Sequence, residues 1–128
     1  MGDLNYEFNR VVWCDVPVEN LRRAAGFYSA VLNVGVAIES FDEHEMGVLD
    51  HQDGNGGCLF VRPNEIRSDG GPLVYFNVDG RIRAAVEAVA ARGGNVLEPI
   101  QSMGLHGFRA VVLDSEGNRI ALHSRRDA

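Results

Sequence analysis

The stretch VVWCDVPVENLRRAAGFY, residues 11–28, decides the fold, because GPLVYFNVDGRIRAAVEA, residues 71–88, repeats its plan. Each copy opens with β-branched and aromatic residues typical of a strand, passes a short turn, and continues with apolar residues at helical spacing. The aligned pairs include Trp13 with Leu73, Asp15 with Tyr75, and Val18 with Val78. The repeat predicts a fold assembled from two similar units.

A second, looser repeat closes each half of the chain. In the first half, Leu49-Asp50 precedes a Gly-Asn-Gly turn and the apolar run Cys58–Val61. In the second half, Leu113-Asp114 precedes the turn Glu116-Gly117-Asn118 and the run Ile120–Leu122. These echoes extend the repeat from the first strand and helix of each half to its last strand.

Both halves are predicted to have the order strand, helix, strand, strand, strand. Asn20 is a suitable cap for the first helix, and Asp79 for the second. The expected strands cover residues 11–18, 36–41, 45–50, 57–61, 73–78, 95–100, 108–113 and 119–123. We place the repeats at about 8–62 and 72–124, with a polar linker at 63–71. A chain of 128 residues fits one domain, since each half alone would bury little of its surface.

The composition limits which binding partners and which cellular compartment we expect for this protein. The net charge of −6, with acids and bases interleaved, argues against nucleic acid, which selects basic patches. We expect no membrane span, because no apolar run approaches the roughly 20 residues required, and no secretory signal at the N-terminus. Cys14 and Cys58 lie in apolar runs without metal-type spacing, which favours reduced thiols in a cytoplasmic protein and leaves a disulfide between them open.

Three motifs in order carry a family resemblance. They are Val16–Leu21 followed by Phe27-Tyr28, then Val78-Asp79, then Asp114–Ile120, which is similar to an Asp-Pro-Asp-Gly-Asn stretch before a last strand. Together with the repeat, they resemble the vicinal oxygen chelate superfamily, which includes glyoxalase I, extradiol dioxygenases, fosfomycin-resistance enzymes and bleomycin-binding proteins. Within it, the chain is most similar to a group described as related to lactoylglutathione lyase, in which Trp13, Phe27-Tyr28 and Leu122-His123-Ser124 recur.

The resemblance implies a fold and a class of partner. The fold is α+β, with tandem βαβββ repeats forming a cupped, eight-stranded mixed sheet or partial barrel and helices on the outside. The implied partners are a small-molecule ligand or substrate and a second copy of the chain in a homodimer. Whether the two repeats pair within one chain or across the dimer stays open.

The resemblance also places the metal ligands of metal-dependent members on this chain. Their positions are occupied here by Trp13, Leu73 and Ala121, with a fourth near Cys58. None of the first three can bind a divalent ion, which needs about three protein ligands of N, O or S type. Shifting the last strand by two residues would add His123, and one histidine does not restore a site. We therefore expect no metal site and no cofactor.

The strand period of two predicts which side chains share a face with those positions. Asp15 lies on the face of Trp13, Tyr75 and Asn77 on that of Leu73, and Arg119 and His123 on that of Ala121. A wall with one carboxylate, one phenol, one amide, one imidazole and one indole suits a small organic ligand. His123 is the best candidate acid or base, because imidazole is the side chain that ordinarily titrates near neutral pH.

His106 is a further candidate, since it lies in a glycine-flanked loop and such loops often border sites. The sequence leaves a purely structural interpretation open for every candidate. Trp13, Tyr75 and Asn77 could serve packing alone, and Asp15 could serve a turn. His123 could be an exposed edge residue and His106 part of a plain turn.

Three functions remain open. The first is a metal-independent enzyme of lyase or isomerase type, with His123 as acid or base and with Asp15 and Tyr75 as binding residues. The second is a non-catalytic protein that binds and sequesters an antibiotic or metabolite. The third, ranked lowest, is a metal lyase with an unorthodox site built from Glu45, His106 and His123.

Overall fold

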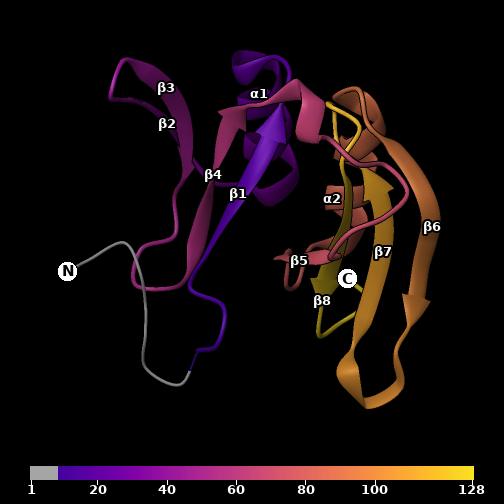
Figure 1. Cartoon of the computed structure of the whole chain (residues 1–128). Helices are drawn as coiled ribbons and strands as arrows, with labels where there is room; N and C mark the ends of the chain where they lie inside the picture. Colours follow the sequence, from indigo (N-terminus) through magenta and orange to yellow (C-terminus); the bar gives the residue numbers. More distant parts are fainter. Residues whose placement is uncertain (1–8) are drawn as a thin grey trace.

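The computed structural model describes residues 9–128 and contains eight strands, two helices and two short 3-10 helices (Figure 1). The first half holds β1 (Trp13–Val18), α1 (Leu21–Leu32), β2 (Val36–Phe41), β3 (His44–Leu49) and β4 (Gly56–Val61). The second half holds β5 (Val74–Asn77), α2 (Ile82–Ala91), β6 (Asn95–Ser102), β7 (Phe108–Leu113) and β8 (Arg119–Ser124). The 3-10 helices are η1 (Pro63–Glu65) and η2 (Gly104–His106). Two predictions fall outside the described residues. They are the start of the first repeat at residue 8 and the expected absence of a secretory signal at the N-terminus.

The strands form two four-stranded mixed sheets with the same topology. Their orders are β1-β4-β3-β2 and β5-β8-β7-β6. In each sheet the first and last strands of the repeat run parallel, and the other pairs run antiparallel. The predicted α+β fold of two βαβββ units is confirmed. The sheets do not close a barrel, and within residues 9–128 no strand pairing joins β1 to β5.

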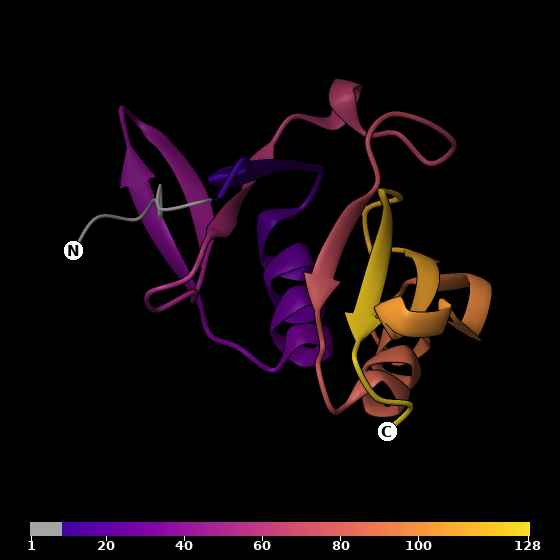
Figure 2. The ribbon, with the colours of Figure 1, turned by 90° about the horizontal axis from the view of Figure 1, so that it is seen from below.

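Each helix packs one apolar face against its own sheet. The buried side chains of α1 include Ala24, Phe27 and Val31, and those of α2 include Ile82 and Ala85. These side chains share one core cluster with the inward residues of both sheets, and the two helices contact each other where the sheets spread apart (Figure 2). The opposite face of each sheet points away from this core. Within residues 9–128, neither helix combines the length and the hydropathy that a membrane crossing requires.

One predicted helix cap is correct and the other is wrong. Asn20 caps α1, and its side-chain oxygen accepts a hydrogen bond of 3.0 Å from the backbone N–H of Arg23. The cap residue of α2 is Arg81 rather than Asp79, because the chain passes through a left-handed conformation at Gly80 (φ 80°) before the helix begins. Asp79 instead accepts hydrogen bonds from the backbone and the guanidinium of Arg125, which lower its pKa to about 2.

The turn between β7 and β8 joins the second half to the first. The Glu116 carboxylate, with a side chain that is 0% exposed, accepts hydrogen bonds of 3.0 and 2.8 Å from the backbone N–H groups of Glu19 and Asn20. It also accepts one of 2.8 Å from Nε of Arg23. These donors surround the first turn of α1, where the unpaired N–H groups of a helix favour a negative charge.

Asp114 lies in the same turn and is 2% exposed. Its carboxylate accepts a hydrogen bond of 2.6 Å from the hydroxyl of Tyr28, which is fully buried in α1. Asn118 completes the connection by donating from its side chain to the backbone oxygen of Pro17 at 2.7 Å. We call the contacts of Asp114, Glu116 and Asn118 with the first half the inter-repeat lock. The motif that carries much of the family resemblance is therefore a structural joint.

Candidate functional site

A cavity of about 600 Å³ lies between the two halves of the chain. Its walls come from β1, from the end of α1, from the turn between β3 and β4, and from β5. Three of the predicted site residues, Trp13, Tyr75 and Asn77, line it together. Asp15, His106 and His123 are not among its lining residues. β1 and β5 thus bring three of the six predicted site residues to one cavity.

Trp13 forms the first-half side of this cavity with His51. The two rings meet edge to face, with their centroids 5.5 Å apart. Nδ1 of His51 lies 2.9 Å from the backbone oxygen of Gly54, a contact that orients the imidazole within the β3–β4 turn. Sequence reasoning did not include His51 in the site, because a histidine in a polar turn carries no periodic signal. The turn folds back over β1, and this places the ring against Trp13.

Asp15 lies on the same face of the first sheet, but its nearest polar partner is a thiol. Sγ of Cys58 donates to Oδ1 of Asp15 at 3.2 Å. Burial, opposed in part by a hydrogen bond from Trp13 and reinforced by Asp15, raises the pKa of Cys58 to about 11. Cys58 is therefore protonated at neutral pH and is a poor nucleophile. Cys14 and Cys58 are both free thiols.

His123 lies on β8 opposite Asn77 of β5 and Arg109 of β7. Its Nε2 is 2.6 Å from the backbone oxygen of His106. A carbonyl oxygen only accepts, so in the neutral ring Nε2 carries the proton and Nδ1 is left as the acceptor. The ring centroid is 6.2 Å from that of Tyr75, which places His123 at the border of the cavity. His106 thus reaches His123 through its backbone, while its own side chain is exposed.

Arg109 is a candidate that sequence reasoning missed. Its Nη1 donates a hydrogen bond to the hydroxyl of Tyr75, and its Nη2 lies 3.7 Å from Oε1 of Glu98. The signal for it was available, because β7 and β8 form a hairpin in which the residue opposite His123 shares its face. Asn77, by contrast, uses its side-chain oxygen to accept from the backbone N–H of Asp79 at 2.8 Å, which supports its structural interpretation.

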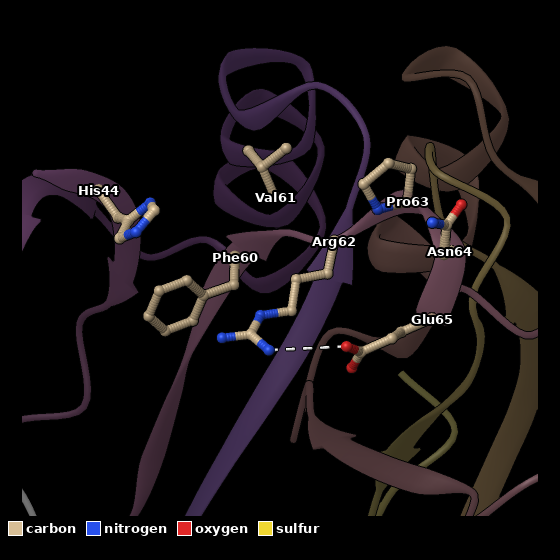
Figure 3. Close-up of a pocket in the computed structure, with 7 residues that line it drawn as sticks. All are labelled: His44, Phe60, Val61, Arg62, Pro63, Asn64 and Glu65. Atoms are coloured by element: carbon tan, nitrogen blue, oxygen red, sulfur yellow. Dashed lines mark ion pairs between the residues drawn. The ribbon is translucent and has the colours of Figure 1, made fainter.

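A second cavity, of about 350 Å³, lies beside β4 and η1 (Figure 3). Figure 3 shows the Arg62 guanidinium between the ring of Phe60 and the carboxylate of Glu65. Its carbon Cζ is 5.4 Å from the ring centroid, and Nη1 is 3.6 Å from Glu65. The residues that line this cavity all lie between His44 and Glu65, so it does not join the two halves of the chain. We therefore regard the cavity between the halves as the candidate site.

The residues at the expected metal positions do not fit a metal ion. Trp13, Leu73 and Ala121 offer no carboxylate, imidazole or thiolate. Throughout the described part of the chain, no group of three or more His, Cys, Asp or Glu residues could hold an ion. The unorthodox set of Glu45, His106 and His123 is not assembled either, because Glu45 pairs with Arg22 at 3.0 Å on the other sheet.

Comparison with known proteins decides the family. A model of the Glyoxalase/Bleomycin resistance protein/Dioxygenase superfamily matches residues 10–122. The chain belongs to this superfamily. Among curated proteins, none matches the sequence of this chain. The match covers both repeats and the cavity between them.

Solved structures of the superfamily share the fold. A glyoxalase-related enzyme from Fulvimarina pelagi aligns with a TM-score of 0.67 and 18% identity, over 91% of this chain and 88% of that one. A glyoxalase/bleomycin resistance protein from Albidiferax ferrireducens aligns with 0.65 and 21%, over 88% and 97%. The fosfomycin resistance protein FosX from Listeria monocytogenes aligns with 0.68 and 12%, over 91% and 93%. At these identities the similarity supports the fold of this chain but does not indicate its substrate.

Proposed function

We propose that this protein binds a small organic molecule in the cavity between its repeats and acts on it without a divalent metal. The observation that carries the proposal is the composition of that cavity, which combines an indole, a phenol and an amide from both halves. In this proposal His123, at the border of the cavity, is the acid or base of a lyase- or isomerase-type reaction. The recurrence of Trp13, Phe27-Tyr28 and Leu122–Ser124 supports membership of the group related to lactoylglutathione lyase.

A non-catalytic binding function is the second candidate. One observation favours it, namely that His123 borders the cavity without being one of its lining residues. A protein that only sequesters its ligand needs an aromatic, mostly apolar wall and a few polar groups, and the cavity has these. In both functions the ligand occupies the same place, so binding is tested first and turnover second.

Trp13 gives a direct measure of cavity occupancy, because it is the single tryptophan of the chain and lines the cavity. We expect small aromatic ligands to change its fluorescence in a saturable way. We expect the binding curve, and any turnover, to be the same after treatment with EDTA and after addition of Mn²⁺, Ni²⁺ or Zn²⁺. Elemental analysis of the purified protein should find far less than one ion per chain.

A constructed metal site provides the control for this experiment. The triple variant Trp13→His, Leu73→His, Ala121→Glu places three donors at the positions that the resemblance assigns to ligands, and Zn²⁺ uptake by this variant in calorimetry would show that the assay detects a metal site when donors are present. Stoichiometric metal in the unmodified protein, or turnover that disappears with EDTA, would overturn the metal-independent proposal. The ligand-binding proposal would survive that result.

We further propose a homodimer, as the resemblance implies, and a cytoplasmic location. Support for the dimer comes from the sheet edges, since in the described residues β1 pairs only with β4 and β5 only with β8. Both strands line the cavity, so a second copy could cover it and use these edges. We expect light scattering to give twice the chain mass of 14.0 kDa, and a mass of one chain at micromolar concentration would contradict the proposal.

A further inference from the structure

Two arginines on the second sheet have a buried donor without a partner. Among residues 9–128, the side-chain N and O atoms that are buried and make no hydrogen bond are Nε of Arg109 and Nε of Arg119. A buried donor that is left unsatisfied costs free energy, about 1–3 kcal/mol in typical cases. Both residues lie on the face of the sheet that points away from the core. Their placement on one face calls for an explanation in terms of what they bind.

The first arginine is held at the border of the cavity. Arg109 donates from Nη1 to Tyr75, a residue that lines the cavity, and its side chain is 26% exposed. Its other partner is weak, because Glu98 is half exposed and its oxygen lies 3.7 Å from Nη2. Nε and Nη2 form the side of a guanidinium that pairs with an oxyanion through two parallel hydrogen bonds. Within residues 9–128, this side of Arg109 therefore lacks a close acceptor.

The second arginine lies further along the same face. β8 presents Arg119, Ala121 and His123 on this face, and its pairing with β7 sets His123 opposite Arg109. Between the two arginines lie Ala121 and Val111, which are 0% and 2% exposed. The face therefore has a small apolar centre with a guanidinium at each end. The sole polar contact of the Arg119 guanidinium in the described residues is a hydrogen bond of 3.3 Å from Nη2 to the backbone oxygen of Gly71.

The overall charge makes this arrangement informative. The chain has a net charge of −6, so its general field repels anions. Most of its arginines that form ion pairs do so at the surface with close carboxylates, such as Arg83 with Asp127 at 2.9 Å. Among residues 9–128, Arg109 and Arg119 depart from this pattern, because each keeps a buried Nε donor without a partner, and Arg109 does so beside Tyr75 of the candidate site.

We infer that the ligand of the cavity carries an oxyanion group, either a carboxylate or a phosphate, and that Arg109 binds it, with Arg119 contributing to a second polar group or to the local potential. This inference rests on the proposed function, because the ring of the ligand occupies the cavity lined by Trp13 and Tyr75. The oxyanion accepts a hydrogen bond from Nη2 of Arg109 in place of the loose contact with Glu98, and the guanidinium turns to bring the buried Nε to the same ligand. Tyr75 connects the two parts of the site.

Matched probes test the inference. Phenylacetate, phenyl phosphate and neutral phenylacetamide share a ring and differ in the group that would meet Arg109. We expect Trp13 fluorescence and calorimetry to show that at least one anion binds about tenfold to a hundredfold more tightly than the amide, the range expected for a charge-assisted pair. Which anion is preferred distinguishes a carboxylate ligand from a phosphate ligand. Raising the salt concentration should weaken the binding of the anion and leave the binding of the amide unchanged.

Variants separate a local role of Arg109 from the effect of net charge. Arg109→Gln should lose the preference for the anion, while Arg109→Lys keeps the charge and should recover only part of it, since lysine lacks the forked geometry. The control Arg83→Gln removes one positive charge from an exposed ion pair and should retain the preference. Circular dichroism and thermal unfolding would show that each variant is folded.

The outcomes distinguish the inference from the proposed function. If the anions and the amide bind equally well and Arg109→Gln has no effect, the inference is wrong and the cavity remains a binding site. If none of the three probes changes the fluorescence of Trp13 or gives heat on titration, both fail. If the preference disappears equally in Arg83→Gln, general electrostatics explains it, and the role assigned to Arg109 is wrong.

Discussion

Replacing Glu116 by alanine is expected to lower the free energy of unfolding by about 2–4 kcal/mol. The side chain is 0% exposed and accepts hydrogen bonds from two backbone N–H groups, those of Glu19 and Asn20, and from Arg23. Alanine removes all these acceptors at once and leaves the first turn of α1 without its anion. Urea unfolding followed by circular dichroism measures the change. The same experiment shows whether the halves still unfold together.

Glu45→Ala is the matched control, because it also removes a glutamate paired with an arginine. Glu45 and Arg22 form an exposed pair, with side chains 50% and 67% exposed. An exposed ion pair contributes little to stability, so the free energy of unfolding of this variant should be close to that of the unmodified protein. If Glu45→Ala and Glu116→Ala were equally stable, the inter-repeat lock would not be a major source of stability.

The pH dependence gives a second readout of the same contact. Burial alone would raise the pKa of Glu116, but the hydrogen bonds from Arg23, Asn20, Ser115 and Glu19 outweigh it and lower the pKa from 4.5 to about 2. Because the folded pKa is the lower one, the stabilisation is complete above about pH 4.5 and is lost as the pH falls towards 2.

The free energy of unfolding should therefore decrease between pH 5 and pH 2, and decrease less steeply in Glu116→Gln. A residual slope is expected in that variant, because the pKa of Asp79 is also lowered to about 2, first by a hydrogen bond from Arg125. An unchanged slope in Glu116→Gln would show that the carboxylate of Glu116 is not the group that titrates with folding.

The repeat predicted the order of the elements but not how the two halves join. Sequence comparison paired Leu49-Asp50 with Leu113-Asp114 as equivalents, yet Asp50 is exposed while Asp114 is 2% exposed. The difference comes from Tyr28, whose hydroxyl needs an acceptor in the core, and which aligns with Ala88 in the second repeat. A buried hydroxyl in one repeat, with no counterpart in the other, makes the joint asymmetric. An alignment of the repeats does not show this, because it scores similarity and the joint depends on a difference.

The repeat predicted which strands border the candidate site, but not which of their side chains do. β1 and β5 supply Trp13, Tyr75 and Asn77 to one cavity, yet residues at the alternate positions of both strands line it as well, so strand alternation does not select them. The carboxylate of Asp15 instead accepts a hydrogen bond from Cys58 across the β1–β4 pair, a contact that depends on strand register. Arg109 was missed because it lies on a third strand, and only the pairing of β7 with β8 brings it to His123. Their roles in binding or catalysis stay predictions.

His123→Gln is expected to lower kcat by about 10²- to 10⁴-fold for any compound that the protein turns over, the usual contribution of a general acid or base. Glutamine can still donate to the backbone oxygen of His106, so the local structure should persist while the proton-transfer group is lost. Trp13 fluorescence should show that ligand binding is retained. The measurement is steady-state kinetics on a panel of small aromatic and electrophilic compounds.

His106→Ala separates the two histidines. The contact with Nε2 of His123 is made by the backbone oxygen of residue 106, which alanine retains. If His123 is the acid or base, His106→Ala should keep most of the turnover, because Nδ1 of His123 is still the acceptor and its ring is still oriented. Equal losses in the two variants would instead assign a chemical role to the His106 side chain. Full turnover in His123→Gln would exclude His123, and the absence of turnover with any compound, together with tight binding, would favour a protein that sequesters its ligand.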